Sequence, residues 1–143
     1  MAFYTHRVPV RTSLETLWAL LLDKIRRPDR YIEGVEKVEI LEDAGPMGIE
    51  RRMHVRSSSR VTAVRERIIA DESTHTVLFK LQGDPVFTGW VVNVIHEDQG
   101  QLELEYSMHW TPRAGAQVPD RDWQDAITRA VEHMCEMAEG RDV

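Results

Sequence analysis

The feature that most constrains the fold of this chain is a strict alternation of apolar and polar residues over residues 101–111. Successive side chains of a β-strand point to opposite faces of its sheet. The pattern therefore predicts a strand with one buried face and one solvent-exposed face. The residues on the apolar face are Leu102, Leu104, Tyr106, Met108 and Trp110.

Strand-like patterns fill the chain from residue 35 to residue 111, interrupted only by short turns rich in Gly, Pro, Asp and Ser. Short connections favour antiparallel neighbours, because a parallel crossover needs about a dozen residues or more. The first segment contains Pro9, which suits an edge strand. The expected strands cover residues 3–10, 35–43, 49–56, 60–70, 75–81, 86–97 and 101–111.

An amphipathic helix is expected between the first two strands. Residues 12–15 fit a capping box, in which Thr12 caps the helix and Glu15 reaches back to it. Pro28 is expected to end the helix, since the residue before a proline avoids helical backbone angles. The apolar residues recur at spacings of three and four and form one stripe: Leu14, Leu17, Trp18, Leu21 and Ile25.

A second amphipathic helix is expected from residue 120 to residue 139. Asp120 is its predicted N-terminal cap, and Gly140 is its predicted end. Such a helix would be about 30 Å long, enough to cross a whole sheet. Its apolar face comprises Trp123, Ile127, Ala130, Val131, Met134, Met137 and Ala138.

This order of elements predicts an α+β domain in which a curved antiparallel sheet of six to seven strands wraps around the long C-terminal helix. A curled sheet that grips a helix leaves space between them unless large side chains fill it. Two interpretations stay open at this point, a packed core and an apolar ligand cavity. The expected lining of this space is Met53, Phe79, Trp90, Tyr106, Met108, Trp110, Met134 and Met137.

Composition and charge limit the classes of function. The chain of 143 residues is 42% hydrophobic and 29% charged, which is typical of one globular domain over residues 1–143. Its net charge of −6 disfavours nucleic acid and anionic membrane surfaces as partners, since both attract Lys and Arg. The most basic stretch, Arg51 and Arg52 with Arg56 and Arg60, is interpreted as a solvated strand face.

Cysteine content and hydropathy indicate the compartment. The one cysteine, Cys135, excludes an intrachain disulfide. The N-terminal residues lack the apolar core of a signal peptide. No apolar run approaches the length of about 20 residues that spans a bilayer. We therefore expect a cytoplasmic protein.

Three stretches, in this order and spacing, resemble the START-like (SRPBCC) superfamily, which includes the polyketide cyclase/aromatase group and Bet v 1. They are Val-Pro-Val at 8–10 followed by Leu-Glu-Thr-Leu-Trp at 14–18, the segments 34–41 and 48–51, and Val-Arg-Glu-Arg-Ile at 64–68. Within the superfamily the chain is similar to small bacterial proteins named AtaL-like. The resemblance implies a helix-grip fold with a deep hydrophobic cavity under the C-terminal helix, and it supplies no particular reaction.

No metal site and no cofactor are expected. None of the six histidines forms the two-histidine helical pair of a zinc protease. The chain also has no phosphate loop, no dinucleotide-binding fingerprint and no Gly-x-Ser-x-Gly elbow.

Two side chains are candidates for chemistry in the pocket. Glu66 shares its strand face with apolar residues, so it would be paired or would have a raised pKa there. The alternative for Glu66 is an ion pair with an arginine of a neighbouring strand. Tyr106 would orient a ligand through its hydroxyl, or it is a core tyrosine with a satisfied hydroxyl. His54 and Asn93 are lesser candidates, since the inward face of their strands is ambiguous.

Three functions follow as hypotheses. The leading one is a carrier of a small hydrophobic molecule. The second is an enzyme of the polyketide cyclase/aromatase or hydrolase type, with Glu66 and Tyr106 directing proton transfer. The third is an interaction module with a solid core, such as a homodimer through an exposed sheet edge. The predicted ligand-binding residues are Met53, Glu66, Phe79, Trp90, Tyr106, Met108, Trp110, Met134 and Met137.

Overall fold

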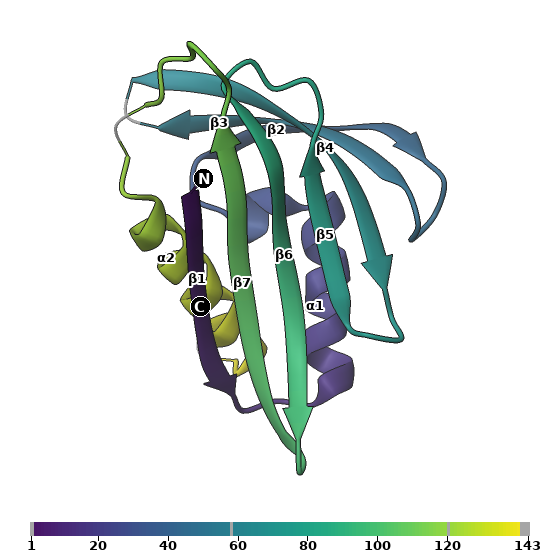
Figure 1. Ribbon diagram of the computed structural model, residues 1–143. Helices are drawn as coiled ribbons and strands as arrows, with labels where there is room; N and C mark the ends of the chain where they lie inside the picture. The colour runs from purple at the N-terminus through teal and green to yellow at the C-terminus, as the bar shows by residue number, and fades with distance from the viewer. Residues whose placement is uncertain (1, 58, 120, 141–143) are drawn as a thin grey trace.

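The computed structural model describes residues 2–57, 59–119 and 121–140 (Figure 1). Within these residues, seven strands form one antiparallel sheet in the order β1-β7-β6-β5-β4-β3-β2. The expected strands and their antiparallel pairing are confirmed. Their bounds are β1 (Ala2–Val10), β2 (Val35–Asp43), β3 (Ile49–Ser57), β4 (Arg60–Asp71), β5 (Thr76–Leu81), β6 (Phe87–Asp98) and β7 (Gln101–Pro112).

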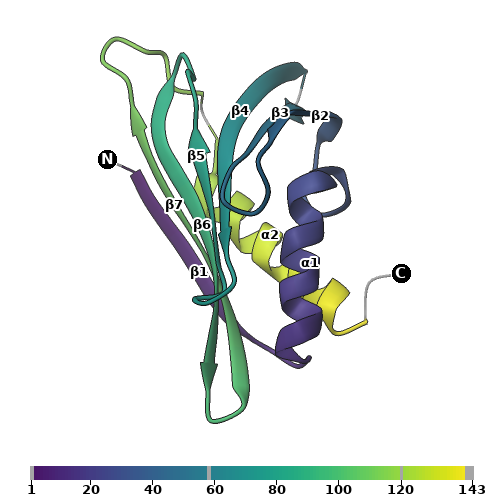
Figure 2. The ribbon, with the colours of Figure 1, turned by 90° about the vertical axis from the view of Figure 1, so that its right-hand side faces the viewer.

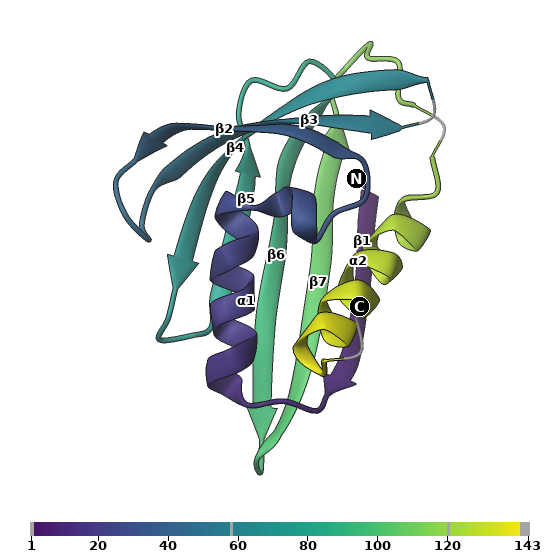
Figure 3. The ribbon, with the colours of Figure 1, turned by 180° about the vertical axis from the view of Figure 1, so that it is seen from behind.

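The order of strands in the sheet follows from short connections. Strands β2 to β7 form a meander in which each pairs with the next, and β1 pairs with β7. The pairing of β2 with β3 shifts register at Val35/Lys37 and at Ile40/Glu42, and such bulges bend a strand. The sheet is curved, with β2 and β3 lying on the side of the helices (Figure 2) and running across the end of β5, β6 and β7 (Figure 3).

The first helix, α1 (Leu14–Arg26), is followed by a short 3-10 helix, η1 (Pro28–Arg30). The predicted cap is wrong by one residue. Ser13 is the cap, and its Oγ accepts a hydrogen bond from the backbone N–H of Thr16 at 3.1 Å. Because Ser13 has extended backbone angles directly before the helix, its hydroxyl reaches the first turn and that of Thr12 does not. The apolar stripe is confirmed by four buried side chains: Leu17, Trp18, Leu21 and Ile25.

The C-terminal helix, α2 (Trp123–Ala138), is shorter than expected, with 16 residues. Its cap is Asp122, whose side chain accepts a hydrogen bond from the backbone N–H of Asp125 at 3.0 Å. The predicted cap, Asp120, lies outside the described residues. The helix packs mainly on β1 and β7 instead of crossing the whole sheet, because α1 lies over β6. Two helices therefore share the concave face (Figure 3).

The core lies between the concave face of the sheet and these two helices, and the architecture is an α+β helix-grip fold, as expected. Every layer contributes fully buried side chains, such as Leu17 of α1, Leu104 of β7 and Met134 of α2. Among the described residues, no helix has both the length and the apolar character that crossing a bilayer requires.

Candidate functional site

Four polar or charged side chains are buried in the core of the part of the chain that the structure describes. Lys24 comes from α1, Arg51 from β3, Glu66 from β4 and Asn93 from β6, and each is at most 5% exposed. Charged residues are almost never fully buried unless they are paired, and perturbed buried groups concentrate at functional sites. Together with Tyr106 of β7, we call these residues the buried polar cluster.

Strand register brings four members of the cluster onto the concave face. Arg51 lies directly opposite Glu66 in the pairing of β3 with β4. Asn93 lies directly opposite Tyr106 in the pairing of β6 with β7. His54 has the opposite parity to Arg51 and is only half-buried, so it does not join the cluster. Of the two lesser candidates, the structure brings in Asn93 alone.

Arg51 connects β3 to β4 and to the end of α1. Its Nη2 lies 2.6 Å from Oε1 of Glu66, and its Nη1 donates to the carbonyl oxygens of Lys24 and Ile25 at 3.1 and 2.9 Å. Carbonyls of a last helical turn have no partner within the helix, so Arg51 completes that end of α1. The prediction that Arg51 belongs to a solvated face is wrong. Its side chain is 1% exposed, because position 51 shares the inward face of β3 with Met53.

Glu66 points inward, as its position on the apolar face of β4 predicted. The structure shows the alternative that was left open for this residue, an ion pair with an arginine of the neighbouring strand. Both side chains of the pair are almost completely enclosed. The carboxylate is therefore held by a permanent cation and is not a free acid or base.

Lys24 was not singled out by the sequence patterns, although a signal was present. It follows Leu21 by three residues and so falls within the apolar stripe of α1. Its Nζ donates a hydrogen bond to Oδ1 of Asn93. The same atom lies over the ring of Tyr106, 4.0 Å from the centroid, and 5.0 Å from the centroid of Phe79. A lysine inside an apolar stripe is thus the local sign of this site.

Burial changes the acid–base properties of two members of the cluster. It lowers the pKa of Lys24 to about 7; the nearby Arg51 acts in the same direction and Glu66 opposes it. A substantial share of the Lys24 amine is therefore uncharged at neutral pH. Burial also raises the pKa of Tyr106, so its hydroxyl stays protonated and is available as a donor.

Three donors of the cluster meet no acceptor among the described residues. They are Nε of Arg51, Nδ2 of Asn93 and the hydroxyl of Tyr106. Buried polar groups nearly always have a hydrogen-bond partner, and leaving one unpaired costs about 1–3 kcal/mol. Since all three groups donate, the group that would satisfy them is an acceptor, such as a carbonyl or carboxylate oxygen.

The structure places the predicted ligand-binding residues in three environments. Trp110 and Met137 are half-buried and pack against the core. The prediction that Trp90 lines the inner space is wrong, because Trp90 is 42% exposed and stacks on the ring of His109. The inward residues of β6 have odd numbers, like Asn93, so Trp90 belongs to the outer face. The buried members are Met53, Glu66, Phe79, Tyr106, Met108 and Met134.

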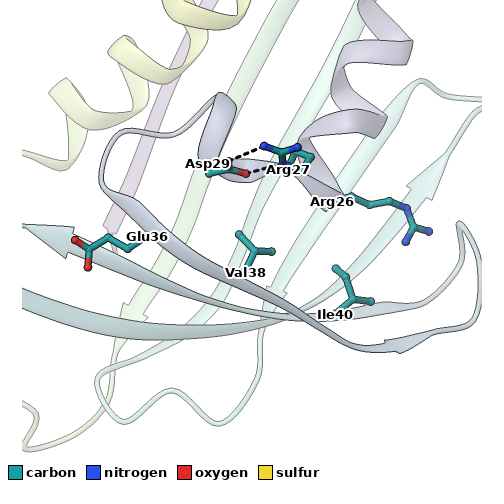
Figure 4. A pocket seen from close by; sticks show the side chains of 6 residues that line it. All are labelled: Arg26, Arg27, Asp29, Glu36, Val38 and Ile40. Carbon is teal, nitrogen blue, oxygen red and sulfur yellow. Dashed lines mark hydrogen bonds and ion pairs between the residues drawn. The ribbon is translucent and has the colours of Figure 1, made fainter.

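Two open hollows flank α1. The first has a volume of about 300 Å³, and in Figure 4 the side chains of Val38 and Ile40 of β2 point toward the end of α1. The second has a volume of about 460 Å³ and adjoins the turn between β4 and β5. The first is lined by Arg26, Arg27, Asp29, Glu36, Val38 and Ile40, and the second by Leu14, Glu15, Trp18, Ala19, Leu22, Glu72 and His75. Neither hollow is bordered by a predicted ligand-binding residue.

Comparison with protein families gives one match over almost the whole chain. The model described as "AtaL: Acetylaranotin biosynthesis cluster protein L" matches residues 6–141. No protein with a curated function matches the chain in sequence.

Solved structures share the fold at low sequence identity. TTHA0849 from Thermus thermophilus has a TM-score of 0.76 and 11% identity, over 99% of this chain and 100% of its own. Ara h 8.0201 has a TM-score of 0.67 and 18% identity, over 97% and 95%. The Zhui aromatase/cyclase from Streptomyces sp. R1128 has a TM-score of 0.65 and 22% identity, over 98% and 85%. At these identities the likeness shows the fold alone.

Proposed function

Since the chain belongs to the AtaL family of the START-like (SRPBCC) superfamily, we propose that it binds a small molecule with an apolar body and a carbonyl or carboxylate group. The buried polar cluster holds the acceptor group, and the apolar side chains around it hold the body. This keeps the leading hypothesis of a hydrophobic ligand and moves its polar contacts from the region under α2 to the buried polar cluster beside α1.

The observation that carries the proposal is the set of three unpaired buried donors on Arg51, Asn93 and Tyr106. They come from three different strands, so no local turn or cap accounts for them. Ligand sites typically combine apolar walls with a few well-placed polar groups. A ligand acceptor that pairs with these donors removes a cost of about 1–3 kcal/mol for each donor satisfied.

The apolar part of the proposed site surrounds these donors. Phe79 lies beside both cations of the cluster, 5.0 Å from Nζ of Lys24 and 5.4 Å from Cζ of Arg51, measured to its ring centroid. Met108 lies two residues along β7 from Tyr106, on the same face. Methionine side chains adapt to irregular shapes, which suits the binding of a flexible apolar body.

A binding function is favoured over a function in which Glu66 acts as an acid–base catalyst. The carboxylate is already paired with Arg51 at 2.6 Å, and the hydroxyl of Tyr106 stays protonated. The likeness to an aromatase/cyclase lies at the level of the fold.

We propose the cytoplasm as the compartment, and the net charge of −6 argues against nucleic acid and anionic membranes as partners. A homodimer through a sheet edge stays a prediction.

Titration with anilinonaphthalene sulfonate, a fluorescent aromatic anion, tests the proposal. We expect saturable binding to the folded protein, and we expect Asn93→Leu and Tyr106→Phe each to weaken it by about ten-fold, the value of one buried hydrogen bond. Thr88→Val, which removes a hydroxyl from the exposed face of β6, is the matched control and should leave the affinity unchanged. Circular dichroism verifies that each variant is folded. Equal affinities of all three variants would overturn the assignment of this site.

A further inference from the structure

We propose that Lys24 is a nucleophilic amine that forms an imine with the carbonyl carbon of a ketone or aldehyde ligand. The inference rests on the proposed function, because the ligand must first enter the buried polar cluster. It goes further by assigning a covalent step and a substrate class. The ligand class with the best fit is a β-dicarbonyl compound, in which one carbonyl reacts and the second accepts from the unpaired donors.

The distribution of charge in the cluster leaves the amine available. The one carboxylate of the cluster, that of Glu66, forms an ion pair with Arg51. Among the described residues, no carboxylate lies within ion-pair distance of Nζ of Lys24. The amine is held instead by the neutral amide oxygen of Asn93.

The surroundings of Nζ also favour its uncharged form. The charged or titratable groups that face it are Arg51 from β3, Glu66 from β4 and Tyr106 from β7, with the amide of Asn93 from β6. Burial and the guanidinium lower the pKa of Lys24 to about 7 against the opposing effect of Glu66. Desolvation and a neighbouring cation are the two means by which proteins activate a lysine for attack on a carbonyl.

The reaction balances without any other reactant. The lone pair of Nζ forms a bond to the carbonyl carbon, and the π electrons of the C=O bond move to oxygen. One proton of the amine is transferred to that oxygen, which gives a neutral carbinolamine. The C–O bond then breaks, and the hydroxyl leaves as water with the second proton of the amine, so the sum is an amine and a carbonyl converted to an imine and one water. No group is oxidised or reduced. The hydroxyl of Tyr106, which stays protonated, supplies a hydrogen bond to the oxygen or to a second carbonyl.

The lysine content of the chain makes the step testable. The chain has three lysines, Lys24, Lys37 and Lys80. Lys37 and Lys80 are exposed, so they report the reactivity of solvent-accessible amines in the same sample. The variant Lys37→Arg/Lys80→Arg keeps Lys24 as its sole lysine, without touching the buried polar cluster.

The probe is acetylacetone, a small β-diketone whose imine with an amine rearranges to a stable enaminone that absorbs in the near ultraviolet. We expect an adduct of one acetylacetone minus one water on the peptide that carries Lys24. Near pH 7 it should form at least about ten-fold faster than adducts on Lys37 and Lys80, and its rate should reach half of its maximum near the pKa of Lys24. The sole-lysine variant should react like the wild type, and Lys24→Met should form the ultraviolet band at least about ten-fold more slowly than the wild type near pH 7.

The outcomes separate this inference from the proposed function. Saturable binding of anilinonaphthalene sulfonate with no adduct on Lys24 overturns the imine and leaves the binding site intact. Loss of both signals in the wild type overturns both proposals. An adduct on Lys37 or Lys80 that forms as fast as the one on Lys24 also overturns the imine assignment. If Lys24→Met does not fold, peptide mapping of the sole-lysine variant still decides the question.

Discussion

Nη2 of Arg51 lies 2.6 Å from Oε1 of Glu66, across the pairing of β3 with β4, and both side chains are almost completely buried. The same guanidinium also donates to the last carbonyls of α1, so one side chain joins the sheet to the helix above it. The pair therefore supports the whole buried polar cluster, and we expect its removal to lower the stability of the fold as well as the affinity for a ligand.

Replacing Glu66 by Gln should be strongly destabilising. The change leaves the guanidinium of Arg51 buried without a counter-charge, and breaking a buried pair in this way costs about 3–5 kcal/mol. Arg65→Gln is the matched control, because it breaks the more exposed pair with Glu50, at 3.0 Å, and should cost less than about 1 kcal/mol. Urea unfolding of both variants provides the comparison. Equal losses would contradict the assigned role of the Arg51–Glu66 pair.

Lys24 should make stability depend on pH. Its pKa in the folded protein is about 7, below the ordinary value of 10.5, so between these values the unfolded chain binds more protons than the folded chain. The contribution of Lys24 to the free energy of unfolding therefore rises with pH through this window, by up to about 1.4 kcal/mol per pH unit. Below the folded pKa both states are protonated and the slope disappears.

The measurement is the free energy of unfolding of the wild type minus that of Lys24→Met, at several pH values between about 6 and 10, which bracket the lowered and ordinary pKa of a lysine. We expect this difference to increase with pH above the folded pKa of about 7. Leu22→Met, on the exposed side of α1, should retain the slope of the wild type. A difference that stays flat across this range would show that the amine is not desolvated.

The N-terminal cap of α1 can be tested by two neighbouring alanine substitutions. Ser13→Ala removes the acceptor for the backbone N–H of Thr16 and should cost about 1 kcal/mol. Thr12→Ala should be nearly neutral, because the first turn of α1 bonds to Ser13. Thermal or urea unfolding distinguishes them. A larger loss of stability in Thr12→Ala than in Ser13→Ala would support the capping box predicted from the sequence, with Thr12 as the cap.

The two tryptophans near the end of the sheet should differ in their effect. Trp110 packs against Phe87 and Trp123, at ring separations of 5.0 and 5.3 Å, so Trp110→Ala should cost about 2 kcal/mol or more. Trp90 is 42% exposed on the outer face, so Trp90→Ala should cost less than about 1 kcal/mol and should not alter probe binding. Urea unfolding and the fluorescence titration check both statements. A binding defect in Trp90→Ala would place the ligand elsewhere.

Two residues of the site could be predicted from local patterns, and two could not. Glu66 and Tyr106 occupy inward positions that period-two alternation makes visible. Arg51 lies in a run of arginines, so its charge suggested a solvent-exposed position. Its place in the alternation of β3, however, is the same as that of the buried residues Ile49 and Met53. Lys24 has helical spacing with an apolar stripe, and only packing against the sheet shows that its amine is buried as well as its stem.

The inward face of β6 also could not be predicted from the sequence. Apolar side chains occur on both faces of this strand, so alternation alone does not reveal which one is inward. Asn93 is inward and Trp90 outward because the helices cover only the concave side of the sheet. The position of α2 over β1 and β7 is decided in the same way, since α1 already occupies the space above β6.

The sequence by itself determined the strands, the two amphipathic helices and the α+β class, because periodicity and turn residues act between neighbours along the chain. Only the tertiary structure decided that Arg51 meets Glu66, that Lys24 meets Asn93, and that donors on Arg51, Asn93 and Tyr106 are buried without a partner. These contacts join residues between 15 and 69 positions apart, so they depend on strand register and on how a helix seats in a curved sheet.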